Sequence, residues 1–91
     1  MKPATSNVVR KYPADGKPED VDEKMTLEQM QAYVGGWIEM VSTSIPHRKL
    51  IINEEGALKM LPANFPATEV VRKGTNMLSG IIRGNALLIK G

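Results

Sequence analysis

The alternation of apolar and polar positions predicts short strands rather than long regular elements. A β-prone run covers residues 8–12, and runs rich in apolar and β-branched side chains cover residues 37–41 and 48–53. The segment 14–24 is acidic, contains glycine and proline and has no periodicity, so we expect a loop there. The most apolar stretch, residues 78–89, is interrupted by glycine; we expect one long strand bent by a bulge, with a tight hairpin turn as the alternative.

Two short helices are predicted from their end signals. Thr26 and Gln29 have the spacing of a capping box, and Gly35 supplies a stop, so the first helix is expected over residues 27–34. Met25 and Met30 are placed for a hydrophobic staple across its first turn. Pro66 suits the first turn of a second helix, which is expected to continue to residue 73.

A β-hairpin is expected between the two helices. Residues 53–56 (Asn-Glu-Glu-Gly) carry a turn signal, with Gly56 at a positive φ, and residues 57–61 return as a strand. Taken together, the elements predict an α+β fold: a small, mostly antiparallel sheet of four to five strands with one or two short helices on one face. We expect one domain, with residues 1–25 forming an N-terminal strand and a partly flexible acidic loop, and residues 26–91 forming the compact part.

Composition removes several classes of function. The chain has 91 residues, no cysteine and one histidine, which excludes disulfides and thiolate metal sites and leaves little for a histidine-based metal or catalytic site. No serine lies in a G-x-S-x-G motif and no phosphate-binding loop motif occurs, so we expect no catalytic residues, no metal, no cofactor and no enzymatic activity. No apolar run reaches the roughly 18 residues of a membrane span, and we expect a cytoplasmic protein.

Charge and polar placement suggest an anion site. The net charge is +2, and the basic residues occur in small groups such as His47-Arg48-Lys49 rather than in a stripe. The start of the second helix offers free N–H groups and a positive dipole end, which favour negative charge. The candidate ligand-binding residues there and on the neighbouring strands are Arg48, Lys49, Asn64, Thr68, Arg83 and Asn85. Trp37 is expected in the core rather than on a nucleic-acid-binding surface.

Several ordered sequence pieces resemble a family of small proteins of unknown function encoded by phages, plasmids and other mobile elements. The pieces are V-G-G-x-I-E, N-E-E-G, L-P-x-N, an Ala-Thr pair and a closing strand with a central glycine, and here they occupy Val34–Glu39, Asn53–Gly56, Leu61–Asn64, Ala67–Thr68 and Ile82–Asn85. The resemblance covers about residues 26–90. It implies a compact α+β domain acting in a host bacterial cytoplasm, and it implies no known activity.

Three functions from different classes follow as hypotheses. The first is a binding protein of a phage or mobile element that counters host defence by sequestering a small anionic, nucleotide-type ligand or a host protein. The second is a nucleic-acid-binding accessory protein, and the third is a structural or assembly subunit. A homodimer is also expected, because an apolar closing strand at a sheet edge would be protected by pairing with a second copy.

Overall fold

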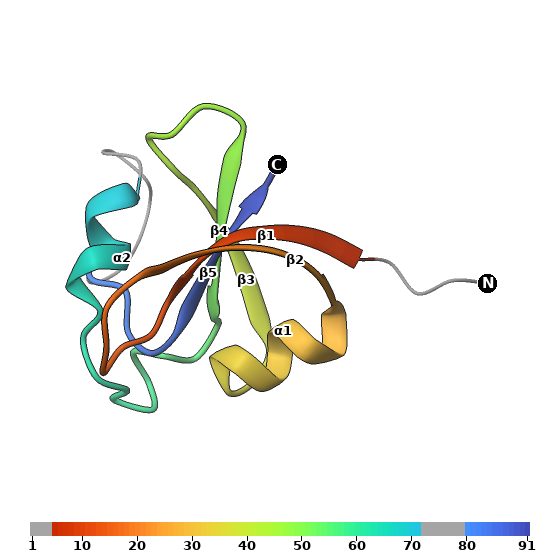
Figure 1. Cartoon of the computed structure of the whole chain (residues 1–91). Coiled ribbons are helices and arrows are strands. Elements are labelled where there is room, and N and C mark those ends of the chain that lie inside the picture. The colour runs from red at the N-terminus through yellow and green to blue at the C-terminus, as the bar shows by residue number, and fades with distance from the viewer. Residues whose placement is uncertain (1–4, 72–79) are drawn as a thin grey trace.

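A computed structural model describes residues 5–71 and 80–91 of the chain, and these residues form one antiparallel sheet with two short helices (Figure 1). The elements in chain order are β1 (Thr5–Tyr12), β2 (Glu19–Thr26), α1 (Leu27–Val34), β3 (Ile38–Ser42), β4 (Arg48–Asn53), α2 (Phe65–Val70) and β5 (Ala86–Lys90). The strands of this five-stranded sheet lie in the order β2-β1-β5-β4-β3, and every neighbouring pair is antiparallel. The α+β class and the largely antiparallel sheet expected from the sequence are confirmed.

The sheet has an apolar core on each face. Along β4, Leu50 and Ile52 belong to the core that includes Ala67 of α2, whereas Ile51 belongs to the core that includes Met30 of α1. Successive side chains of a strand point to opposite faces. The two helices therefore lie on opposite faces of the sheet, rather than together on one face. This arrangement explains why β4 and β5 are buried along most of their length.

The N-terminal hairpin corrects the expectation of an acidic loop. Only the connection between β1 and β2 is irregular, and from Glu19 onward the segment is a strand paired with β1. Two of its four acidic side chains form ion pairs with β1: Arg10 pairs with Asp20 (2.8 Å) and Lys11 with Glu23 (3.3 Å). Charged side chains on an edge strand hide its strand pattern and also discourage edge-to-edge aggregation.

The first helix follows its sequence signals closely. Thr26 Oγ1 accepts from the Gln29 N–H, and the Gln29 side chain accepts from the Thr26 N–H, which completes the expected capping box. Gly35 ends the helix with φ 88°, in the left-handed region that favours glycine. Met25 and Met30 are both buried in the same core, as expected of a staple. Trp37 is 67% exposed, so its expected core position is wrong; the strand after it begins at Ile38.

The hairpin expected after β4 is absent, because β4 pairs with β3 and β5 instead. Residues 54–60 form turns, and no return strand forms over residues 57–61. Gly56 has no positive φ; a side chain there would meet the Arg83 carbonyl oxygen at 2.9 Å, so close backbone approach accounts for this glycine. Within the described residues, α2 ends at Val70, and the expected continuation over residues 72–73 lies outside them.

The closing strand also differs from expectation. β5 begins only at Ala86, and Gly84 (φ 84°) lies in the bend before it, so neither the long bulged strand nor a hairpin forms around that glycine. β5 lies between β1 and β4 at the centre of the sheet. It therefore exposes no edge, and the route to a dimer expected through this strand is wrong. No helix among the described residues is long and apolar enough to cross a membrane.

Candidate functional site

The structure divides the six predicted site residues into two groups at opposite ends of β5. Arg48 lies opposite Lys90, the last residue of β5, and Lys49 follows it on β4. Asn85 and Arg83 precede the first residue of β5, and Asn64 lies beside them, because its N–H donates to the Ile82 carbonyl. Five residues of β strand separate the groups by roughly 17 Å. A single small ligand cannot be held by all six.

Asn64 has a structural role that its position in the sequence does not reveal. Its side chain is 1% exposed, and its Nδ2 donates to the carbonyl oxygens of Tyr12 and Gly84, both at 2.8 Å. Its Oδ1 accepts from the Ala67 N–H and caps α2. Thr68 Oγ1 donates to the Asn64 carbonyl and accepts from the Ile82 N–H. These groups join α2 to the sheet, and the side-chain donors of Asn64 and Thr68 are occupied within the protein.

Asn85 and Arg83 also tie distant segments together. Asn85 Oδ1 accepts from the Ala14 N–H at 2.9 Å, and its Nδ2 donates to the Tyr33 carbonyl at 3.1 Å. It thereby connects the β1–β2 turn to the end of α1. Arg83 Nη1 donates to the Leu61 carbonyl at 3.1 Å, beside an isolated β-bridge between Ala63 and Arg83. This group of residues supports the fold rather than a ligand.

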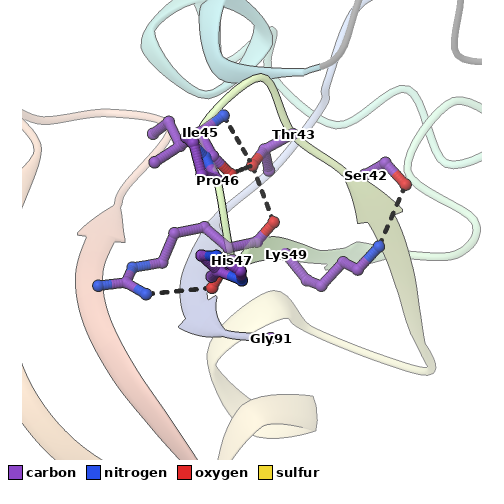
Figure 2. Close-up of a pocket in the computed structure, with 8 residues that line it drawn as sticks. Ser42, Thr43, Ile45, Pro46, His47, Lys49 and Gly91 are labelled. Atoms are coloured by element: carbon purple, nitrogen blue, oxygen red, sulfur yellow. Dashed lines mark hydrogen bonds between the residues drawn. The ribbon is translucent and has the colours of Figure 1, made fainter.

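The other group lines a cavity of about 360 Å³ at the loop between β3 and β4. The loop projects at the top of Figure 1, close to the C-terminal end of β5. Figure 2 shows the cavity from close range. Its lining comes from the end of β3, the loop, the start of β4 and the end of β5, and consists of Ser42, Thr43, Ile45, Pro46, His47, Arg48, Lys49 and Gly91.

Thr43 fixes the shape of this loop. Its side chain lies inside the turn, and Oγ1 is 2.8 Å from the Arg48 carbonyl oxygen and 3.0 Å from that of Ile45. The same oxygen accepts from the Ile45 N–H at 3.2 Å (Figure 2). His47 adopts φ 60°, a left-handed conformation that few non-glycine residues adopt, and its carbonyl accepts from the Gly91 N–H at 2.9 Å. These bonds restrain the loop between β3 and β4.

Two cationic side chains, those of Arg48 and Lys49, line the cavity. Arg48 Nη1 donates to the His47 carbonyl at 3.0 Å, and Lys49 Nζ donates to Ser42 Oγ at 3.3 Å, so both cations have neutral acceptors. Among the described residues, neither has a carboxylate within 4.0 Å; the two ion pairs there belong to the β1–β2 hairpin. Lys90 stands directly opposite Arg48 in the ladder, and like charges in that position repel. A bound anion would relieve this repulsion.

The residues predicted from the sequence include Arg48 and Lys49 of this cavity but none of its other lining residues. The signal for His47 was its place in a short basic run, but no sequence pattern brings Ser42, Thr43 and Gly91 to it. These residues meet because β4 pairs with β3 on one side and β5 on the other, placing Lys49 opposite both Ser42 and Ile89. Register between strands, rather than spacing along the chain, builds the site.

Burial changes the pKa of two tyrosines among the described residues. Desolvation by burial raises the pKa of both Tyr12 and Tyr33; for Tyr12 the nearby Arg10 lowers the pKa and Asp20 raises it, and for Tyr33 the acidic Asp15 and Glu19 add to the increase. Both phenols therefore remain neutral in the physiological range. Within the described part of the chain, no group of three or more metal-ligating side chains occurs.

A second, shallower hollow lies at the other end of β3. It has a volume of about 290 Å³ and is lined by Gln31, Gly36, Trp37, Glu55 and Lys59. Three apolar residues that belong to this lining or lie close to it in the sequence are exposed: Trp37 is 67%, Leu58 83% and Met60 82% exposed. Its lining contains one acid and one base, so it lacks the unbalanced charge of the cavity at the β3–β4 loop.

Comparison with known proteins identifies a family but no activity. Residues 7–91 match a family described as a domain of unknown function, DUF3846. No curated protein and no solved structure matches the chain. The match covers every described strand and helix apart from the first two residues of β1. It agrees with the expectation of a family of unknown function, and we conclude that the chain belongs to the DUF3846 family.

Proposed function

We propose that this protein is a small, non-enzymatic binding protein that holds an anionic ligand of nucleotide type in the cavity at the β3–β4 loop. The observation that carries the proposal is that Arg48 and Lys49 line one cavity while neither is paired with a carboxylate of the described residues. Arginine offers several N–H donors in a planar fork that matches phosphate or carboxylate oxygens, and lysine adds a point charge.

The size and lining of the cavity favour a small ligand. Its volume of about 360 Å³ falls at the lower end of the range of about 300–1,000 Å³ usual for ligand pockets. Ser42 and Thr43 are polar residues of the lining, and Ile45 and Pro46 are its apolar residues. A ligand with a phosphate group beside Arg48 and Lys49, and with a compact organic part against Ile45 and Pro46, would match these polar and apolar parts of the lining.

The biological setting is part of the same proposal. The resemblance to proteins of phages and mobile elements suggests a role in the cytoplasm of a host bacterium. A protein that removes a nucleotide-type signal from solution must bind it tightly and be abundant, but it needs no catalytic group. We identify no catalytic group among the described residues, and sequestration is consistent with that. We therefore propose counter-defence by sequestration.

Capture of a host protein is the second candidate, because Trp37, Leu58 and Met60 expose most of their side-chain surface. Large exposed apolar side chains are common at protein interfaces. A nucleic-acid-binding accessory role and an assembly role remain alternatives of other classes. Binding to nucleic acid would weaken steeply with added salt, which distinguishes it from capture of a small ligand.

An NMR titration of the 10.0 kDa protein tests the ligand and its location together. Inorganic phosphate and then a mononucleotide are added at constant ionic strength to ¹⁵N-labelled protein. We expect saturable amide shifts centred on residues 42–49 and Gly91. Shifts centred instead on residues 64–68 and 83–85, or no saturable shift with either probe, would contradict the proposal.

A further inference from the structure

The hollow at the start of β3 is lined by polar side chains that are unpaired within the described residues. It lies at the end of β3 away from the β3–β4 loop, beside the end of α1 (Figure 1), and has a volume of about 290 Å³. Its lining consists of Gln31, Gly36, Trp37, Glu55 and Lys59. Among residues 5–71 and 80–91, none of the side chains in this lining forms a hydrogen bond, and the Glu55 carboxylate has no cation within 4.0 Å. These donors and acceptors are therefore available to a ligand.

The two sides of this hollow are bonded to each other. Asn53, which is 4% exposed, donates from Nδ2 to the Val34 carbonyl at the end of α1 (3.0 Å), and its Oδ1 accepts from the Glu55 N–H (2.7 Å). The Glu54 N–H donates to the Trp37 carbonyl at 2.9 Å. These bonds restrain the backbone of both Trp37 and Glu55, so less freedom is lost when a ligand binds their side chains.

Gly36 leaves room for the Lys59 ammonium. A Cβ atom at Gly36 would lie 3.2 Å from Asn53 Nδ2 and 3.5 Å from Lys59 Nζ. Gly36 is not among the glycines with a positive φ, so space rather than backbone conformation favours glycine here. The Lys59 N–H donates to the Glu55 carbonyl at 2.9 Å, and one turn therefore supplies both the acidic and the basic side chain of the hollow.

Trp37 gives the hollow an aromatic surface. Its side chain is 67% exposed, and its ring belongs to neither of the two apolar cores of the described residues. Exposed aromatic rings of proteins bind the faces of nucleobases by stacking. A small hollow that combines an aromatic ring with a few polar groups is typical of a site for a planar organic ligand.

We propose that this hollow binds a guanine base, stacked on Trp37, as a ligand site separate from the cavity at the β3–β4 loop. The guanine ring carries two neighbouring N–H donors, at N1 and at the N2 amino group, beside the O6 acceptor. The Glu55 carboxylate can accept from both donors, and the Lys59 ammonium can donate to O6. The Gln31 amide, which both donates and accepts, is available to the remaining polar atoms of the base.

The charges of the lining disfavour other classes of ligand. Lys59 repels a cationic ligand and Glu55 an anionic one, which leaves an uncharged ring that carries both donors and acceptors. Adenine presents its amino group beside the N1 acceptor, whose lone pair would face the carboxylate. Cytosine also has an acceptor beside its amino group, and uracil has a single N–H between two carbonyl groups. Among the four common RNA bases, only guanine offers a carboxylate two adjacent donors.

Tryptophan fluorescence tests this site, because Trp37 is the single tryptophan of the chain. Guanosine is the probe, since it carries the base without the phosphate group that the cavity at the β3–β4 loop is proposed to bind. We expect saturable quenching by guanosine. Glu55→Gln keeps the size of the side chain but removes its charge, and it should weaken binding by about tenfold or more, whereas Leu58→Ala should stay within about twofold. Leu58 is the matched control because it lies in the same turn, is 83% exposed and does not belong to the lining.

Two RNA pentamers identify the source of the base. One holds a single central guanosine among uridines, and the other holds uridines alone. Tighter binding of the guanine-containing strand than of guanosine and the uridine strand assigns the site to single-stranded RNA. Equal binding of that strand and guanosine assigns it to a free nucleotide or nucleoside, and both results support guanine recognition. Equal binding of the two strands would contradict it.

Adenosine and inorganic phosphate are the comparison ligands. We expect adenosine to bind about tenfold more weakly than guanosine, because it offers the carboxylate a single donor group. In ¹⁵N-labelled protein, guanosine should shift the amides of residues 36–37 and 54–59, and inorganic phosphate should leave these amides unchanged. The proposal would be overturned by a lack of saturable quenching by guanosine, by equal affinity for adenosine, or by equal weakening in Leu58→Ala and Glu55→Gln.

Discussion

Replacing Asn64 with alanine is expected to lower the free energy of unfolding by about 3 kcal/mol or more. The substitution removes both hydrogen bonds to the Tyr12 and Gly84 carbonyls and the bond that Oδ1 accepts from the Ala67 N–H. These groups lie in the interior, and each buried polar group left without a partner costs about 1–3 kcal/mol. Equilibrium unfolding in urea, followed by circular dichroism, measures the change.

Asn7→Ala is the matched control for this prediction. Asn7 is a half-buried residue of β1, and among residues 5–71 and 80–91 no side-chain hydrogen bond involves it. We expect its replacement to change stability by about 0.5 kcal/mol or less. If Asn64→Ala were as well tolerated as Asn7→Ala, the buried amide would not be the junction between α2, β1 and the segment before β5.

Replacing Arg48 or Lys49 with alanine is expected to weaken binding of a phosphate-bearing ligand by about 10- to 150-fold each. A hydrogen bond to a charged group contributes about 1.5–3 kcal/mol, and about 1.4 kcal/mol corresponds to a tenfold change in affinity. Both side chains lie at the partly open end of β4, so the melting temperature should change little. Isothermal titration calorimetry with a mononucleotide measures the affinities.

Arg83→Ala is the control that separates the cavity from the site first expected from the sequence. Arg83 carries the same charge but lies near the other end of β5, where it donates to the Leu61 carbonyl. Its replacement should leave affinity within about twofold of the unmodified protein. Loss of binding in Arg83→Ala with unchanged binding in Arg48→Ala would place the ligand near Arg83, and this would contradict binding in the cavity at the β3–β4 loop.

The parts of the fold that were predicted correctly depend on local signals. The capping box at Thr26 and the stop at Gly35 act within one helix, and the apolar run over residues 48–53 identifies a buried strand without knowledge of its neighbours. β2 was missed because its strand pattern is interrupted by charges, whose partners Arg10 and Lys11 are supplied by β1. Trp37 was misplaced because hydrophobicity alone does not show which residues lie outside the sheet.

Of the residues proposed for ligand binding from the sequence, only Arg48 and Lys49 line the candidate cavity, and the reason again lies in long-range contacts. Polar residues in apolar surroundings suggested ligand donors, but Asn64 and Asn85 bond to backbone groups 52 residues or more away in the chain as well as nearer ones. Such partners leave no trace in spacing along the sequence. Arg48 and Lys49 were found because they belong to a short basic run, and both remain half-buried at the start of β4.

Native mass spectrometry of the protein purified from its host cells tests the central claim of ligand sequestration most directly. We predict a co-purifying small anionic mass on the unmodified protein, retained in Arg83→Ala and lost when Arg48 and Lys49 are both replaced by alanine. Retention of the small mass by that double variant would contradict the assigned cavity. A bare protein, or one carrying a host polypeptide or a nucleic acid in place of a small molecule, would contradict the proposed function.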